Sequence, residues 1–267
     1  MIEEQVLKKL AREWKLKVED VEKYYILGWI LYGISKSTIG KKIVFKGGTA
    51  ISKVYFPSDW RLSEDLDFTS PDEVDWNTVI DALEKEIPKI IQKESGISLR
   101  RKPRDIPHTN VGYLQYKMGY TGPLFSGMIK IEVTKETFLG KVVTKPIPND
   151  PSDFDYPEFS LQVYSLETII GEKIRAILQR GYIRDYYDVW RLLKENRFEL
   201  DEAKNMFDKK CKAKGIKFSN IDDFFPNGIV DTLKEHLPNL MRLTREPLPT
   251  IEELIRESRE LLEKFLS

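Results

Sequence analysis

The segments KGGTAISK (Lys46–Lys53) and RLSEDLDFT (Arg61–Thr69) carry the pattern on which the expected fold rests. The first segment continues the apolar run Lys42–Lys46, and its two glycines predict a short strand, a turn and then a helix. In the second segment polar and apolar residues alternate over Asp65–Phe68, as in a strand with one wet face. The sequence therefore predicts a strand–turn–helix unit with an acidic strand directly across from the glycine turn.

Apolar periodicity extends this pattern along the rest of the chain. In the first half, helices are expected at Ile2–Trp14, Val18–Ser35, Thr49–Tyr55 and Trp76–Glu94. Alternating segments punctuated by Gly and Pro predict antiparallel strands at Gly112–Gly119, Gly127–Thr134, Val142–Pro146 and Phe159–Val163. After Tyr164 the expected elements are helices, at Leu166–Arg180, Asp185–Lys194, Leu200–Lys214 and Thr250–Phe265.

The Pro- and Asp-rich segment Pro146–Pro157 is the natural linker between these two kinds of pattern. Strands and helices precede it, and the segments that follow Tyr164 are helical. The expected fold class is therefore α+β, followed by an all-α C-terminal domain. We place the first domain, with its N-terminal helices, at residues 1–160 and the helical domain at residues 161–267.

The composition narrows the classes of function. The formal net charge is +0 and the pI is about 6.8, so no whole-molecule basic field attracts nucleic acid and any RNA contact must be local. The single Cys211 and the two histidines, His108 and His236, argue against a zinc cluster and a multi-histidine metal site. The longest apolar stretch, Tyr25–Ile34, is short and interrupted by glycines. We therefore expect a cytoplasmic protein with no membrane partner.

The glycine turn is a candidate anion site. Backbone N–H groups at Gly47 and Gly48, between a strand and a helix, can approach a phosphate. Thr49 can cap the helix or bond a phosphate oxygen, and Lys53, one turn further on, can reach the same anion. The alternative is an ordinary strand–turn–helix in which the glycines serve only the turn.

Two carboxylates follow in the acidic strand. Asp65 and Asp67 lie two residues apart in an extended segment, so both side chains project to one face. Neighbouring carboxylates repel each other unless a positive charge lies between them, and hard oxygen ligands favour Mg²⁺, with Mn²⁺ as an alternative. Arg61 could supply that charge instead, in a purely structural ion pair.

A third acid, Glu132, lies in the segment MIKIEVT at Met128–Thr134. The alternation buries the apolar residues of this segment and leaves Lys130 and Glu132 on the other face. If the segment pairs beside Asp65–Phe68, Glu132 joins the two aspartates, and three acids around two metal ions are typical of phosphoryl transfer. The alternative is a solvated strand face with an exposed Lys/Glu pair.

The helical half contributes a separate candidate. Lys173 lies in the middle of an apolar helical stripe, where a lysine is expensive to bury unless its amine meets a partner. Asp185 points inward from the next helix, and Asp188 lies on its flank. One interpretation is a Lys173–Asp185 ion pair that joins the two helices. The other is that Lys173 contacts nucleotide phosphates while Asp185 orients it or assists the nucleophile.

Two basic runs are candidate RNA surfaces, although such runs are often only solvated faces. They are Arg100–Arg104 and Lys209–Lys217. The first is the more informative because it lies between the Asp65–Phe68 and Glu132 strands and has Tyr113 and Tyr116 nearby.

These motifs together resemble a known family. KGGTA followed by RLSEDLDF is similar to the N-terminal signature of AbiEii-type nucleotidyltransferases, toxins of type IV toxin–antitoxin systems within the DNA polymerase β-like superfamily. The segment Ser165–Leu193 resembles the second signature, a Glu-Lys helix followed by an Arg-Asp-x-x-Asp helix. The resemblance implies a nucleotidyltransferase fold, a mixed sheet with flanking helices, and an added helical domain. It also implies Mg²⁺-dependent transfer of a nucleoside monophosphate from an NTP to RNA, in some relatives the tRNA 3′ end, and a cognate antitoxin partner.

The resemblance also implies roles for individual residues. The triphosphate would be cradled by Gly47, Gly48 and Thr49. The metal would be held by Asp65, Asp67 and Glu132. Phosphate would be contacted by Lys53 and Lys173. Asp185 would be the active-site acid of the second signature, with Asp188 structural, and Ser63 could bond a phosphate or act as a control point.

Two other classes of function compete with this one. Asp65–Thr69 fits the D-x-D-x-T motif of haloacid-dehalogenase-type phosphatases, but that motif needs a buried apolar strand running into its first Asp, and Arg61–Glu64 is mostly polar. The second alternative is a non-catalytic nucleotide- or protein-binding module on the same fold.

Overall fold

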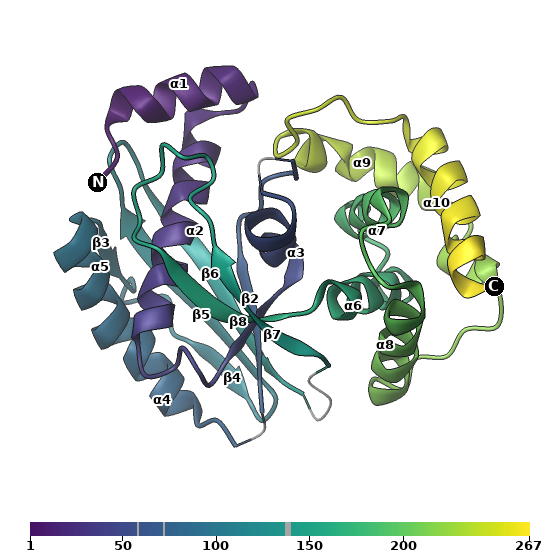
Figure 1. Ribbon diagram of the computed structural model, residues 1–267, viewed down its shortest axis with the longest axis horizontal. Coiled ribbons are helices and arrows are strands. Elements are labelled where there is room, and N and C mark those ends of the chain that lie inside the picture. The colour runs from purple at the N-terminus through teal and green to yellow at the C-terminus, as the bar shows by residue number, and fades with distance from the viewer. Residues whose placement is uncertain (58, 72, 137–139) are drawn as a thin grey trace. The chain divides into compact units, whose positions relative to one another are not determined.

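The computed structural model describes residues 1–57, 59–71, 73–136 and 140–267 and divides the chain into two compact units, Met1–Tyr164 and Ser165–Ser267. The first unit contains a sheet with flanking helices, and the described elements of the second are helices (Figure 1). This confirms the α+β class with a helical C-terminal part. The division follows Tyr164 rather than residue 160, because the last strand of the sheet continues through Tyr164.

The first unit is built on a mixed sheet. Its described strands are β1 (Val44–Lys46), β2 (Leu66–Ser70), β3 (Ser98–Arg100), β4 (His108–Asn110), β5 (Tyr113–Thr121), β6 (Ser126–Lys135), β7 (Val142–Ile147) and β8 (Phe159–Tyr164). They follow the order β3-β5-β6-β2-β1-β8-β7, and β4 pairs with β5. The expected antiparallel pairing holds for β5–β6 and β7–β8, whereas β2–β6 and β1–β8 are parallel. Parallel pairs join segments far apart in sequence, which a local pattern does not encode.

Two strands were not expected from the sequence. β3 and β4 have three residues each, and a polar, Pro-interrupted segment lies between them. Such short segments show no periodicity, and both gain their backbone partners only from the long strand β5.

Helices of the first unit flank this sheet. They are α1 (Glu4–Trp14), α2 (Val18–Lys36), α3 (Gly47–Ala50) with the π-helical turn η1 (Ile51–Tyr55), α4 (Trp76–Asp81) with the π-helical turn η2 (Ala82–Glu86), and α5 (Ile87–Ser95). Figure 1 shows α2 and α5 across the same face. The two helices approach closely at Gly33, where an added Cβ would lie 2.9 Å from side-chain atoms of both Ile87 and Ile91. The opposite face of β5 and β6 keeps its polar side chains at least partly exposed.

The buried side chain of Glu22 connects helix α2 to the turn between β5 and β6 by hydrogen bonds. Glu22 is fully buried, and its carboxylate accepts hydrogen bonds from the backbone N–H groups of Leu124 at 2.9 Å and Phe125 at 3.0 Å. Burial raises the pKa of Glu22, and the two N–H donors offset only part of that rise. Glu22 therefore holds α2 against this turn, and the same burial makes ionisation of its carboxyl group less favourable.

The second unit is a helical bundle. Its elements are α6 (Leu166–Gln179), α7 (Ile183–Glu195), α8 (Leu200–Ala213), the 3₁₀ turn η3 (Ile221–Phe224), α9 (Ile229–Met241) and α10 (Ile251–Leu266). Helix α6 approaches α8 closely at Gly171, where a Cβ would lie 2.6 Å from the backbone N of Phe207. Helix α9 was not expected, because Pro238 interrupts its pattern. Among the described residues of both units, no helix combines the length and apolarity that crossing a bilayer requires.

Candidate active site

The glycine turn and the acidic strand meet at one end of the β1–β2 pair. The antiparallel register places Lys46 opposite Asp67, and Gly47 follows with a φ of +77°, in the left-handed region. A Cβ at Gly47 would lie 3.0 Å from the Cβ of Asp67 and would overlap its carboxylate. Only glycine therefore fits here, and the turn lies directly against Asp67, as the sequence predicts.

Thr49 fastens this turn to the acidic strand. The Thr49 side chain is fully buried, and its hydroxyl donates a hydrogen bond to the backbone carbonyl of Asp65. Helix α3 begins at Gly47, so Thr49 lies inside the helix rather than at its cap. The expected cap or phosphate contact is thus replaced by a bond between backbone segments.

Arg61 and Ser63 line the other side of the turn. A Cβ at Gly48 would lie 3.0 Å from Nη2 of Arg61 and 3.6 Å from Oγ of Ser63. Arg61 is 2% exposed, and its Nη1 donates to the carbonyl of Leu62 at 3.1 Å. A buried guanidinium beside backbone N–H groups favours an anion at this turn. The sequence suggested Arg61 only as a structural partner of the aspartates.

Glu132 lies next to Asp67 in the sheet. The parallel register of β2 and β6 places the two residues side by side, with Ile131 buried next to Leu66 on the other face. The Glu132 carboxylate accepts hydrogen bonds from the hydroxyl of Tyr113 and, at 3.0 Å, from Nε2 of Gln115. The pairing of the two acidic strands, which the sequence left as a condition, is therefore present.

Lys130 is the cation that the sequence left unassigned. Its Nζ lies 3.6 Å from Oδ2 of Asp65 and 3.4 Å from Oε2 of Glu132. Burial lowers the pKa of Lys130, but the negative charges of Asp65, Glu132 and Asp67 outweigh it and hold the pKa above its usual value. Lys130 thus keeps its charge and partly neutralises the acids around it.

The same contacts set the charge state of Glu132. Burial raises its pKa, but the bonds from Tyr113 and Gln115 and the charge of Lys130 outweigh burial, so the pKa lies below its usual value. Burial and the neighbouring Glu132 raise the pKa of Tyr113 to about 12. Near neutral pH the site therefore contains an ionised Glu132 and a protonated Tyr113.

The donor set fits a magnesium ion that is completed by substrate. Asp65 and Asp67 offer carboxylate oxygens on one side of the strand. Lys130 contacts both Asp65 and Glu132, and Glu132 also accepts hydrogen bonds from Tyr113 and Gln115. Within the described ranges, no group of three or more His, Cys, Asp or Glu side chains is placed to hold a metal ion. Mg²⁺ usually binds one or two carboxylates together with water and substrate phosphates, so two aspartates are sufficient.

The second unit contains a separate ion cluster. Nζ of Lys173 lies 3.2 Å from Oδ1 of Asp185 and 2.8 Å from Oδ2 of Asp188. Arg180 donates to both oxygens of Asp185, from Nε at 2.8 Å and from Nη2 at 3.1 Å. Burial raises the pKa of Asp185, but Lys173 and Arg180 outweigh it and hold the pKa below its usual value. Asp188, expected only on the flank, is fully buried and makes the shorter contact with Lys173.

Comparisons with known proteins identify the family of this chain. The family model described as "Nucleotidyl transferase AbiEii toxin, Type IV TA system" matches residues 29–265. The chain belongs to the AbiEii family. It is therefore a nucleotidyltransferase of the type IV toxin–antitoxin class, as the two sequence signatures predict.

Solved structures share the fold of this AbiEii-family chain. MenT4, a nucleotidyltransferase toxin from Mycobacterium tuberculosis, has 13% identity and a TM-score of 0.57, with 97% of this chain and 98% of that chain covered. JHP933 from Helicobacter pylori has 18% identity and a TM-score of 0.54, with 94% and 93% covered. No protein of curated function matches the sequence.

The phosphatase alternative is wrong for this member of the AbiEii family. Strand β2 begins at Leu66, so the segment that runs into Asp65 is not a strand. The D-x-D-x-T mechanism needs a buried apolar strand there, but in this chain Asp65 immediately precedes β2 and Asp67 is its second residue.

Lys53 does not lie where the resemblance implies. It is 2% exposed, and its Nζ lies 3.5 Å from the centre of the Tyr24 ring, 5.5 Å from that of Phe154 and 5.8 Å from that of Tyr156. Helix α3 passes into the π-helical turn η1 before Lys53, which carries its side chain among these rings rather than toward Thr49. Its position argues for a cation–π anchor in the core and against a phosphate contact.

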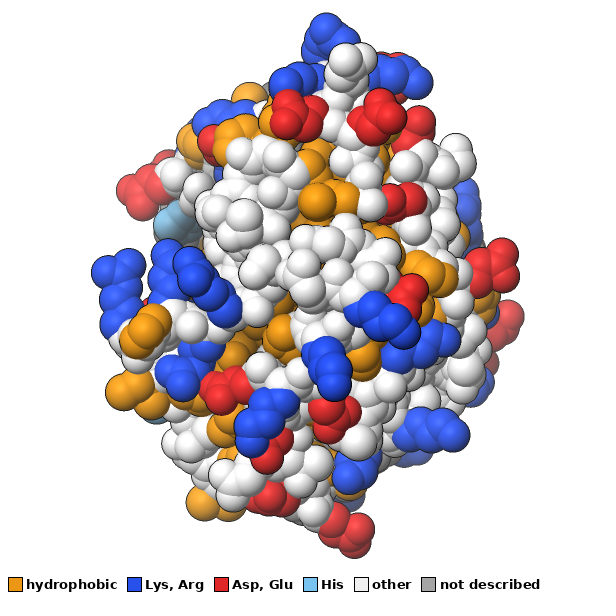
Figure 2. All heavy atoms as spheres, turned by 90° about the vertical axis from the view of Figure 1, so that its left-hand side faces the viewer, with side chains coloured by type: hydrophobic (Ala, Val, Ile, Leu, Met, Phe, Trp, Pro, Cys, Tyr) orange, Lys and Arg blue, Asp and Glu red, His pale blue; other side chains and the backbone are white. Residues whose placement is uncertain are grey.

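Each basic run contains a cation that is paired with an acid, although most of its other cations are exposed. Nε of Arg101 lies 2.6 Å from Glu84, and Tyr116 is buried. In the second run, Lys210 is buried and pairs with Glu172 at 3.0 Å. On the face shown in Figure 2, basic and acidic side chains are interspersed, in keeping with the net charge of zero.

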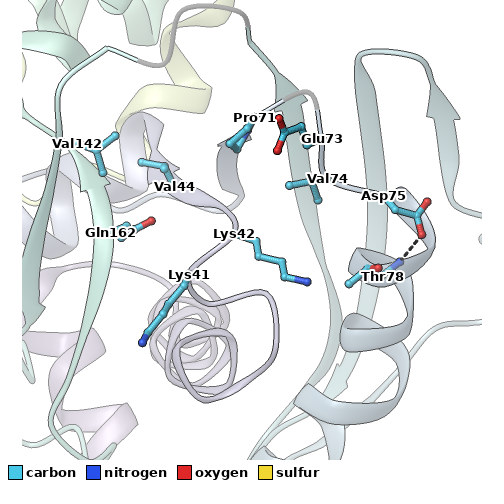
Figure 3. A pocket seen from close by; sticks show the side chains of 10 residues that line it. All are labelled: Lys41, Lys42, Val44, Pro71, Glu73, Val74, Asp75, Thr78, Val142 and Gln162. Carbon is cyan, nitrogen blue, oxygen red and sulfur yellow. Dashed lines mark hydrogen bonds between the residues drawn. The ribbon is translucent and has the colours of Figure 1, made fainter.

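A pocket of about 560 Å³ lies at the other end of the β1–β2 pair, where Val44 pairs with Thr69 (Figure 3). Its lining includes Lys42 and Asp75, but Asp75 already caps α4 by accepting from the backbone N–H of Thr78 at 3.3 Å. Because Asp67 pairs with the opposite end of β1, this pocket is separate from the acidic site.

Proposed function

We propose that this chain transfers a nucleoside monophosphate from an NTP to the 3′ end of an RNA acceptor, most simply a tRNA, in a Mg²⁺-dependent reaction. The observation that carries the proposal is the contact of Gly47 with Asp67, because it brings the glycine turn, where we propose that the triphosphate binds, next to a carboxylate. Membership of the AbiEii family supports a toxin role, and we propose a cognate antitoxin as its partner.

The triphosphate would lie over the glycine turn. The first N–H groups of a helix have no intrahelical acceptor, and α3 begins at Gly47. Arg61 and Ser63 lie against Gly48 and can add a charged and a neutral donor. These groups would orient the chain of phosphates toward Asp65 and Asp67.

Asp65 and Asp67 would hold the metal ion, whose chemistry is to neutralise the phosphate oxygens and to lower the pKa of the attacking hydroxyl. The acceptor 3′-oxygen then bonds to the α-phosphorus, the bond from this phosphorus to the bridging oxygen breaks, and pyrophosphate leaves. The hydroxyl proton is released to solvent. The positive charge of Lys130 would partly offset the negative charges of Asp65 and Glu132.

The decisive experiment is incubation with total tRNA, Mg²⁺ and each radiolabelled NTP in turn. We expect transfer of label by the wild type and none by Asp67→Ala, whereas Asp153→Ala, an exposed acid in the same unit, should behave as the wild type. Equal labelling by the Asp67 variant would overturn the metal assignment.

A thermal shift with NTP and Mg²⁺ separates the non-catalytic alternative from the enzyme. A ligand that binds only the folded state raises the melting temperature according to its concentration and affinity. Stabilisation without labelling of any RNA would favour a nucleotide-binding module. Absence of both would argue against a nucleotide site at the glycine turn.

A further inference from the structure

The polar face of β5 and β6 carries an ordered set of charges beside the acids. The β5–β6 register places Gln115 opposite Glu132, then Lys117 opposite Lys130, then Gly119 opposite Met128. Moving along β5 from Gln115 to Gly119 therefore leads away from the acids. On the outer side of β5, Arg100 of β3 pairs with Gly119 and so lies on the same face.

Two cations on this face differ in their surroundings. Lysines directly opposite each other in antiparallel strands repel, which costs free energy unless anions offset it. Lys130 has Asp65 and Glu132 as partners, but Lys117 is exposed and makes no ion pair with any residue in the described ranges. An unbalanced lysine next to the catalytic acids suits an anion that comes from outside the chain.

Arg100 extends this positive strip. It is exposed and, within the part of the chain that the structure describes, forms no ion pair, whereas its neighbour Arg101 is bound to Glu84 on the other side. Arg100 and Lys117 are diagonal neighbours across β3 and β5, a relationship that corresponds to roughly 7–8 Å. Gly119, which is next to both Arg100 and Lys117, has no side chain and therefore adds no bulk to the surface between these two residues.

An apolar side chain lies beside these cations. Met128, opposite Gly119, is 37% exposed, although most apolar residues of β6 are buried. Grooves that bind single-stranded nucleic acid combine cations for the phosphates with aromatic platforms for the bases. Met128 offers a smaller apolar surface on which a base can pack. An acidic protein segment would also match these cations, but nothing would favour its extending toward the negatively charged Asp65 and Asp67.

We propose that Lys117 and Arg100 bind backbone phosphates of the single-stranded 3′ end of the RNA acceptor and lead its terminal hydroxyl toward Asp65 and Asp67. This proposal rests on the proposed function, because the strand is the acceptor of that reaction. The strip formed by Lys117, Arg100 and Met128 then selects a polynucleotide end over a free nucleoside.

The test uses the full chain and the double variant Lys117→Gln/Arg100→Gln. Its control is Lys89→Gln/Lys93→Gln, which removes the same charge from the exposed side of α5. The probe is a fluorescent single-stranded RNA with a free 3′-hydroxyl, titrated at several salt concentrations. NTP binding is followed separately by the thermal shift.

We expect the strip variant to bind the RNA about tenfold more weakly and to lose about 1.4 from the slope of log affinity against log salt, since each phosphate contact to a single strand contributes about 0.7. The NTP-induced thermal shift should not change, and the control should match the wild type. Equal RNA affinity of the strip variant and the wild type would overturn the proposal.

The outcome also separates this proposal from the proposed function. RNA binding that depends on the strip, in a protein that no NTP stabilises, would support the strip and count against nucleotidyl transfer. Failure of the wild type to bind the RNA even at low salt would overturn the strip, and would favour an acidic protein as the partner of this face.

Discussion

The hydroxyl of Thr49 donates a hydrogen bond to the backbone carbonyl of Asp65, and this contact joins the glycine turn to the strand that carries the acids. The Thr49 side chain is fully buried, and Asp65 is partly exposed. The distance between the triphosphate site and the carboxylates therefore depends on a bond that touches neither substrate nor metal.

Replacing Thr49 by Val keeps the shape of the side chain and removes this donor. The carbonyl of Asp65 then loses a buried partner, so we expect a loss of about 1–3 kcal/mol in the free energy of unfolding and a lower rate of nucleotidyl transfer. Urea unfolding and labelling of tRNA measure the two effects. Thr49→Ser should restore most of both, and a fully active Thr49→Val enzyme would contradict this role.

Replacing Gly47 by Ala tests the contact on which the site depends. The left-handed φ of +77° and the approach to the Asp67 Cβ both disfavour a side chain, so we expect loss of transfer and a destabilisation of roughly 1–3 kcal/mol. Gly112→Ala is the matched control, because an added Cβ there meets no atom within 4 Å. Wild-type turnover by the Gly47 variant would show that turn and acids act independently.

Glu22 should give the stability of the chain a measurable dependence on pH. Its pKa is raised in the folded state, so the folded state binds the proton more tightly than the unfolded state. The contribution of Glu22 to stability is therefore greatest below its ordinary pKa and declines as pH rises through the folded value.

The difference in unfolding free energy between the wild type and Glu22→Gln isolates this contribution, because other acids titrate equally in both proteins. We expect that difference to fall between acidic and neutral pH and then to level off. A difference that is constant with pH would contradict the burial of an ionisable Glu22 against Leu124 and Phe125.

Removing Lys173 should damage the second unit. Lys173→Met leaves Asp188 and Asp185 buried with one less cation, and breaking a buried pair in this way costs about 3–5 kcal/mol. Lys212→Met, at an exposed site on α8, should change little. Chemical unfolding of the full chain measures the loss.

The same variant addresses the predicted phosphate contact of Lys173. If Lys173 only stabilises the packing of α6 against α7 through its ion pairs, the Lys173→Met variant should bind NTP with the wild-type affinity. This is measured at low temperature, where we expect the variant to remain folded. A selective loss of NTP binding in that folded protein would instead support the phosphate role that the family resemblance implies.

Much of this protein follows from local sequence. Two glycines after a short strand predict the turn at Gly47, and a period of two puts Asp65 and Asp67 on one face. The same period puts Lys130 and Glu132 on the wet face of β6. These features depend on backbone geometry over a few residues, and the AbiEii signatures add the expected fold and activity.

The tertiary structure decided which of these segments meet. The parallel pairing of β2 with β6 places Glu132 beside Asp67, and only then does Lys130 lie between acids of two strands. The burial of Lys53 among aromatic rings likewise depends on α2 and on Phe154, more than a hundred residues apart in the chain. The physical reason is that periodicity specifies a direction for each side chain, whereas burial of apolar surface between distant segments selects its neighbours.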